Sequence, residues 1–171
     1  MGTMLRIAIL TITMVCLTVV GHATTIEYTA TQISGPQWQY TYTVTGSFAD
    51  GDFLSIDFDA NAFADLQDPP QVTDWNADVW QSDAALGSNG AFNAMAQKGN
   101  PSVPVTFTVL FNFLGMGTPG SQAFSVFGAD GSTEDGTTIL AGQTAPVPEP
   151  GTLLLLLSGA GALTRKFRKS A

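Results

Sequence analysis

The sequence has almost none of the side chains on which most enzyme mechanisms depend. Among 171 residues it contains one cysteine, Cys16, and one histidine, His22. Both lie within residues 1–23, which we expect to be removed as a signal peptide. The mature chain would then lack thiols and imidazoles, which excludes disulfides, Ser–His–Asp and Cys–His nucleophiles, and histidine-based metal sites. We therefore predict no cofactor.

Basic residues are equally scarce in the body of the chain. Of the six Lys and Arg residues, Lys98 alone lies between Thr24 and Pro150, whereas all 14 acidic residues lie there. The formal charge of this stretch is about −13, which repels nucleic acids and anionic surfaces. The composition thus excludes nucleic acid as a partner.

The first 23 residues have the organisation of a secretory signal peptide. A short start with one positive charge, Arg6, precedes an apolar run over residues 7–20. Gly21 and Ala23 supply the small side chains that signal peptidase reads, which predicts cleavage between Ala23 and Thr24. A retained N-terminal anchor is the alternative, but the apolar run is shorter than the roughly 20 residues that a spanning helix needs.

Residues 24–146 predict a single all-β domain. Polar and apolar residues alternate over residues 38–44 and 105–113, which is typical of half-buried strands. Further strands are predicted at residues 25–31, 53–59, 75–81, 91–96, 121–127 and 137–143. Gly, Pro, Asn and Asp clusters separate them, and only residues 60–66 suggest a helical turn. About eight short strands favour a two-sheet antiparallel β-sandwich, either Ig-like or jelly-roll.

Three tryptophans raise the possibility of carbohydrate binding, because an exposed indole can stack on a sugar ring. Trp75 and Trp80 are five positions apart, so a strand places them on opposite faces and at most one is exposed. Burial in the core is the favoured interpretation for these residues and for Trp38. An exposed Trp beside Asp residues would instead indicate a carbohydrate-binding or adhesive module.

Acidic clusters offer calcium binding and glycoside hydrolysis as further alternatives. Asp50–Asp52, Asp57–Asp59 and residues 130–136 carry oxygen ligands of the kind that Ca²⁺ prefers. The last cluster departs from an EF-hand loop because its glycine comes one place late and no closing Glu follows. We predict a solvated turn there. A glycosidase needs two carboxyl groups about 5–9 Å apart, and nothing in the sequence marks such a pair, so we predict no enzyme activity.

Residues 147–171 carry a proline-flanked motif, an apolar run and a basic cluster, in that order. The motif is Pro148-Glu149-Pro150, and the apolar run covers residues 152–163. As a helix this run is apolar on all sides, which favours membrane insertion over packing against the domain. It is shorter than the membrane core of about 30 Å, a gap that snorkelling basic side chains can narrow. We expect four basic residues to act as a cytoplasmic membrane stop: Arg165, Lys166, Arg168 and Lys169.

These three features resemble the sorting signal of the PEP-CTERM proteins of Gram-negative bacteria. The resemblance implies recognition by an exosortase, a membrane-embedded cysteine transpeptidase that removes the helix near the motif. This chain would be the substrate and would carry none of that chemistry. Members of the family are associated with extracellular polysaccharide and biofilm matrix. The spacer before the basic cluster is short for the family. The body also resembles small single-domain members at residues 54–59 and 114–122, which implies a β-sandwich and no particular binding residues.

Together these observations predict an exported protein with a temporary membrane anchor. Signal peptidase and exosortase would process it through an inner-membrane intermediate. The mature protein would then reach the cell surface or the exopolysaccharide matrix. There it would act as a non-enzymatic structural or interaction protein, with carbohydrate binding or adhesion as the alternative.

Overall fold

The computed structural model describes residues 24–143, which form ten β-strands and no helix. The strands are β1 (Thr25–Ser34), β2 (Gln37–Thr45), β3 (Phe53–Phe58), β4 (Phe63–Gln67), β5 (Trp75–Trp80), β6 (Gly90–Ala96), β7 (Val105–Phe113), β8 (Ala123–Phe127), β9 (Thr133–Thr137) and β10 (Ile139–Leu140). The all-β prediction is confirmed for this part of the chain. The predicted signal helix and the predicted membrane helix at residues 152–163 lie outside the described residues.

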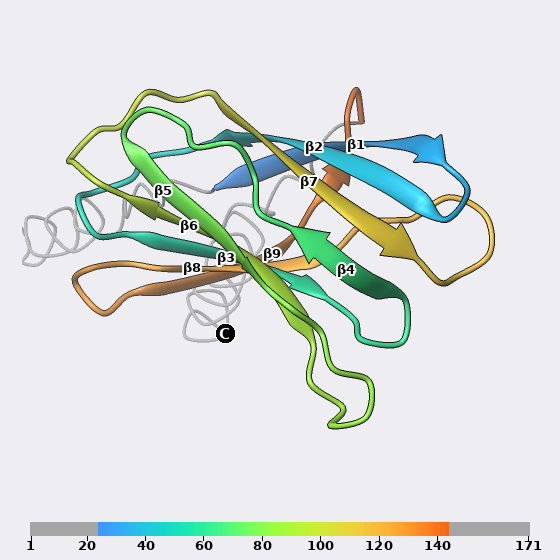
Figure 1. Cartoon of the computed structure of the whole chain (residues 1–171). Coiled ribbons are helices and arrows are strands. Elements are labelled where there is room, and N and C mark those ends of the chain that lie inside the picture. The colour runs from blue at the N-terminus through green and yellow to red at the C-terminus, as the bar shows by residue number, and fades with distance from the viewer. Residues whose placement is uncertain (1–23, 144–171) are drawn as a thin grey trace, which may run out of the picture.

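The strands form two five-stranded sheets that face each other across a hydrophobic core (Figure 1). The first sheet has the order β10-β1-β2-β7-β4, and the second has the order β5-β6-β3-β8-β9. The predicted two-sheet sandwich is therefore confirmed. One strand pair differs from the antiparallel prediction, since β10 runs parallel to β1, with Glu27 opposite Ile139. The pair is parallel because β10 reaches this edge by crossing over from β9 rather than through a hairpin from β1.

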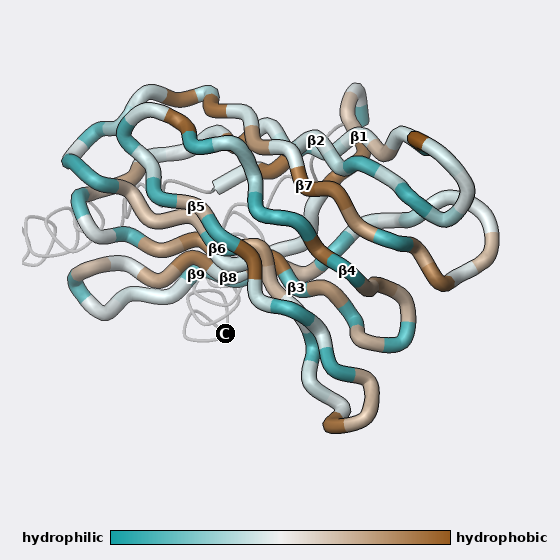
Figure 2. The backbone as a smooth tube through the Cα atoms, viewed as in Figure 1, coloured by the Kyte–Doolittle hydropathy of each residue, from teal (hydrophilic) through white to brown (hydrophobic). Residues whose placement is uncertain are grey.

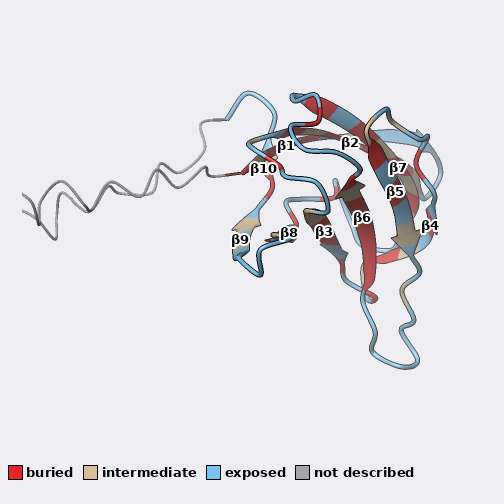
Figure 3. Ribbon diagram, turned by 90° about the vertical axis from the view of Figure 1, so that its left-hand side faces the viewer, coloured by how far each residue is buried: buried red, intermediate tan, exposed pale blue. Residues whose placement is uncertain are grey.

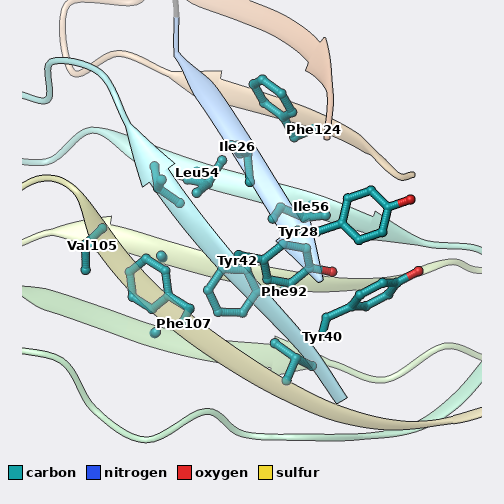
Figure 4. Packing of buried hydrophobic residues seen from close by; sticks show 14 of the residues in the cluster. Ile26, Tyr28, Tyr40, Tyr42, Leu54, Ile56, Phe92, Val105, Phe107 and Phe124 are labelled. Carbon is teal, nitrogen blue, oxygen red and sulfur yellow. The ribbon is translucent and has the colours of Figure 1, made fainter. Parts of the chain in front are cut away.

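Aromatic side chains from both sheets fill the core. Along β2 every second residue is buried, as the alternating sequence predicts, and Figure 2 shows hydrophobic and hydrophilic residues alternating along the strands. Tyr40 of β2 stacks on Phe111 of β7, with ring centroids 4.8 Å apart. Phe58 of β3 contacts both rings from the opposite sheet, at 6.1 and 5.8 Å. Figure 3 shows the buried residues between the sheets, and Figure 4 shows their side chains. Burial of each such ring contributes roughly 2–3 kcal/mol.

The helical turn predicted at residues 60–66 is correct only at its start. Residues 60–62 form a turn in which Phe63 N donates to Asp59 O at 2.9 Å, whereas Phe63–Gln67 forms the edge strand β4. Phe63 and Leu66 are both buried, which is the three-residue spacing of a helix face. The spacing arises instead from an irregularity in the pairing with β7 between Ala64 and Gln67, where Asp65 has a φ of 53°. An extra residue in a bulged strand shifts the next inward side chain by one position.

The predicted solvated turn at residues 130–136 is correct for its first part only. Asp130 and Ser132 lie in the exposed turn between β8 and β9, whereas Thr133–Thr137 forms strand β9. Pairing with β8 defines this strand, in which Glu134 lies opposite Val126 and Gly136 opposite Phe124. The alternation that would have indicated a strand is missing because the two inward positions are a glutamate and a glycine.

The other predicted strands are found near their expected positions. β1, β2, β3, β5, β6 and β7 begin and end within a few residues of the predicted ranges, and β8 begins two residues after residue 121. The predicted strand at residues 137–143 is much shorter, because Thr137 ends β9 and only Ile139 and Leu140 form β10.

Candidate binding face and sorting signal

The outward side of the second sheet combines exposed aromatic and acidic side chains. We call this surface the Trp80 face and define it by the outward residues of β5, β6, β3, β8 and β9. At one edge of the face, Trp80 is 63% exposed. Ala91 lies beside Trp80 and has Asp57 on its other side. Since adjacent strands are about 4.8 Å apart, the backbones of Trp80 and Asp57 are roughly 10 Å apart. Ala91 itself is only 8% exposed, so the side chains around it cover most of its surface.

A row of hydrogen-bonded polar side chains crosses the same face, next to the Trp80 position. The residues that share this row are Asp78, Asn93, Ser55, Ser125 and Asp135. The amide nitrogen of Asn93 donates to Asp78 at 3.1 Å, and the Ser55 hydroxyl donates to the Asn93 amide oxygen at 3.1 Å. At the other end of the row, the Ser125 hydroxyl donates to Asp135 at 2.6 Å. The row offers carboxylate acceptors and hydroxyl groups, which is suitable chemistry for contacts with a polyhydroxylated ligand.

A second aromatic group lies beyond this polar row. Phe53 of β3 and Phe127 of β8 are paired across strands, with ring centroids 6.2 Å apart and an interplanar angle of 37°. Along β3, Phe53 is four positions from Asp57, which shares a cross-strand row with Trp80. Four residues of a strand span about 13 Å. The face therefore carries two separate aromatic groups with polar side chains between them.

The other two tryptophans belong to the core. Trp75 is 3% exposed and contacts Phe107 at 5.6 Å, and Trp38 is 9% exposed. The prediction that at most one of Trp75 and Trp80 is exposed is confirmed. The favoured interpretation that Trp80 is also buried is wrong, because Trp80 ends edge strand β5 with its side chain on the outer side of the sheet. Sequence reasoning also missed the neighbours of Trp80 on the face, because strand register cannot be read from one strand. Alternation alone marks Asp57 and Asp78 as outward residues without showing which residues lie beside them.

Each of the three acidic clusters proposed as calcium ligands has a carboxylate that caps a turn. Asp52 accepts hydrogen bonds from Ala49 N at 2.6 Å and from Ala129 N at 2.9 Å, and so links two loops. Asp59 accepts a bond from Asn61 N at 2.9 Å. Asp130 accepts one from Ser132 N at 2.9 Å, and bonding to Ser132 lowers the pKa of the Asp130 carboxyl. Within residues 24–143, no group of three or more His, Cys, Asp or Glu residues is arranged to hold a metal ion.

The predicted signal-cleavage position lies at the start of the described chain. Thr24 precedes β1 and is only 8% exposed. Its backbone nitrogen donates to Glu134 Oε1 at 2.6 Å, and its hydroxyl donates to Glu134 Oε2 at 2.9 Å. These bonds join the start of the first sheet to edge strand β9 of the second. Sequence reasoning grouped Glu134 with the acidic cluster at residues 130–136 and missed this pairing, because its partner is 110 positions away.

The predicted sorting residues lie outside the described part of the chain. They are Ala23 of the cleavage pair, the motif Pro148, Glu149 and Pro150, and the membrane-stop residues Arg165, Lys166, Arg168 and Lys169. The structure describes the segment just before the motif. There, Ala141 N donates to Tyr28 O at 2.9 Å, which fixes the chain beside β1. Residues 24–143 include no helix long and apolar enough to cross a membrane.

Comparison with known proteins identifies the C-terminal segment. No curated protein matches the sequence. Among solved structures, a cohesin module from a family 33 glycoside hydrolase of Clostridium perfringens ATCC13124 is similar at 7% sequence identity and a TM-score of 0.41. The match covers 70% of this chain and 97% of that chain. A family model described as the PEP-CTERM protein-sorting motif matches residues 146–170. This motif implies export, handling at the membrane and processing by an exosortase, and the chain therefore carries the sorting signal of PEP-CTERM proteins at residues 146–170.

Proposed function

We propose that this protein is an exosortase substrate whose mature β-sandwich is a non-enzymatic structural or interaction protein of the cell surface or the exopolysaccharide matrix. The observation that carries the proposal is the sorting motif at residues 146–170. The composition of residues 24–143 supports it, because this part contains no Cys or His and only one basic residue, Lys98. A dense acidic surface keeps such a domain soluble at high local concentration.

Processing can be tested by replacing Pro148, Glu149 and Pro150 together with alanine. Cells of a Gram-negative bacterium that has an exosortase would produce either the wild type or this variant. We expect the variant to remain in the membrane fraction with its C-terminal residues, whereas the wild type leaves that fraction with a lower intact mass. A matched control replaces Gln143 and Thr144 with alanine, just before the motif, and should behave as the wild type. Identical mass and location of wild type and triple variant would contradict the proposal.

The second candidate function is binding of a neutral or weakly charged glycan on the Trp80 face. The exposure of Trp80, with Asp57 and the polar row near it, favours this function. An indole can cover the apolar face of a sugar ring, while carboxylates accept bonds from its hydroxyl groups. The acidic charge of the domain disfavours strongly anionic polysaccharides.

Glycan binding can be tested with exopolysaccharide isolated from the producing cells. Because an aromatic contact contributes about 0.5–1.5 kcal/mol beyond area burial, Trp80→Ala should weaken co-sedimentation affinity about threefold to tenfold. Leu86→Ala is the matched control, since Leu86 is also an exposed apolar residue but lies in the β5–β6 loop. Equal affinity of the wild type and the Trp80 variant would eliminate this face as the glycan site.

A further inference from the structure

Glu134 occupies an unusual position for a carboxylate. In edge strand β9 it lies opposite Val126, which is buried, so its side chain is directed to the inner side of the second sheet. It is partly buried rather than fully exposed. Removing a carboxylate from water is costly unless a cation or several hydrogen-bond donors compensate.

Thr24 supplies the donors that reach this carboxylate. Its backbone nitrogen and its hydroxyl each bond to a different carboxylate oxygen, at 2.6 and 2.9 Å. The backbone of Gly46 packs closely against Thr24, since a Cβ added at Gly46 would lie 3.3 Å from both the Thr24 Cα and its hydroxyl oxygen. The Thr24 nitrogen is therefore held at Glu134 by contacts on two sides.

No basic side chain of the described residues can neutralise Glu134. Lys98 is the only Lys, Arg or His between residues 24 and 143, and its ammonium is 2.8 Å from Asp74. The nearest source of positive charge is then the Thr24 nitrogen itself. It is a neutral amide in the precursor, but it becomes an amine once the Ala23–Thr24 bond is hydrolysed.

We propose that Glu134 is a binding site for the α-ammonium group that signal peptidase creates at Thr24. Water adds across the Ala23–Thr24 peptide bond, so Ala23 leaves as a carboxylate and the Thr24 nitrogen becomes a protonated amine. The resulting –NH₃⁺ forms an ion pair with Glu134 while the Thr24 hydroxyl keeps the second oxygen. This inference rests on the export proposed above. It adds that cleavage completes the fold, because a charge-assisted hydrogen bond is roughly twice as strong as a neutral one.

The test measures how fast the α-amine of Thr24 is acetylated in protein that cells have produced from the full-length gene and exported. Purified protein is treated briefly with an acetylating ester near pH 7.5, then digested and analysed by mass spectrometry. Lys98 serves as the internal reference. A carboxylate beside the ammonium favours the charged, unreactive form, so we expect acetylation about tenfold slower in the wild type than in Glu134→Gln. Asp135→Asn is the matched control, since it removes the adjacent acid on the outward side of β9 and should leave the rate unchanged.

A second measurement needs no variant and covers the case in which Glu134→Gln does not accumulate. Acetylation of the wild-type α-amine, relative to Lys98, should be several-fold faster in concentrated urea than in the folded protein. Equal relative rates in folded and unfolded protein, or in wild type and Glu134→Gln, would overturn the proposal. An N-terminal peptide that begins at a residue other than Thr24 would also overturn it. Failure of exosortase processing would appear separately, as an uncleaved C-terminal peptide.

Discussion

A buried hydrogen bond between the two sheets gives a quantitative test of the fold. The Tyr42 hydroxyl on β2 donates to the side-chain oxygen of Gln122, which precedes β8. The Gln122 amide nitrogen donates to Asp57 O at 2.8 Å, and its backbone nitrogen donates to the Thr138 hydroxyl at 2.9 Å. These bonds fix the position of Gln122, so its side-chain oxygen cannot turn toward water when the tyrosine hydroxyl is removed.

Tyr42→Phe should therefore leave a buried acceptor without a partner. Such a group costs about 1–3 kcal/mol, whereas the apolar area of the ring is unchanged. For a domain of this size, the loss corresponds to a fall of about 3–15 °C in the melting temperature. Tyr40→Phe is the control, because the Tyr40 hydroxyl donates to Gly120 O at 2.6 Å and Gly120 is exposed. Water can replace that bond, so its loss should cost less than about 1 kcal/mol.

Urea unfolding followed by tryptophan fluorescence measures both effects on the same scale. The denaturation midpoint should fall while the m-value stays constant, since neither variant changes the surface exposed on unfolding. A Tyr42→Phe variant as stable as the wild type would refute the reasoning. A larger loss for Tyr40→Phe than for Tyr42→Phe would refute it as well, because it would mean that burial of Gln122 does not determine the cost.

Three further predictions concern pH, a close contact and the one ion pair of the described residues. Burial raises the pKa of Tyr42 well above its ordinary value of 10.0, so the unfolded state releases this proton first and stability should fall above pH 10. Circular dichroism and phenolate absorbance should change together there, and separate transitions would contradict this. Gly136→Ala should destabilise the protein by about 1–3 kcal/mol in urea unfolding, since the added Cβ would lie 2.4 Å from the Phe124 ring. An unchanged midpoint would show that the ring moves freely. Lys98→Ala should cost about 1 kcal/mol or less, because the Lys98 side chain is 55% exposed and its ammonium is solvated, although the Asp74 side chain is only 15% exposed. A larger loss in the same assay would show that Asp74 depends on this ion pair.

The sequence predicted the class of the fold because most strands follow a simple alternation. β2 and β7 alternate almost perfectly, and Gly- and Pro-rich turns mark their limits. The two misassigned segments are edge strands, where one sheet neighbour is missing and the sequence is less constrained. A bulge disguises β4 as a helix face, and β9 has Glu134 and Gly136 where apolar residues would be expected.

The candidate sites were predictable to different degrees. The sorting motif is a local pattern of consecutive residues, so it could be read directly from the sequence. The Trp80 face depends on which residues of five strands lie side by side, and alternation does not contain that register. The bond between Thr24 and Glu134 is the hardest to predict, because no sequence pattern around either residue shows that the two lie together.

The parallel pairing of β10 with β1 has a consequence for the order of assembly during export. β1 emerges first and can form its hairpin with β2 at once, but its other edge has no partner until Ile139 and Leu140 follow. An open strand edge is a place where chains associate wrongly. This edge of β1 is paired only when β10 binds to it, and the two strands are separated by roughly a hundred residues of sequence. Contacts between such distant segments form late in folding. The last strand of the described domain thus pairs with the first, shortly before the segment that carries the sorting motif.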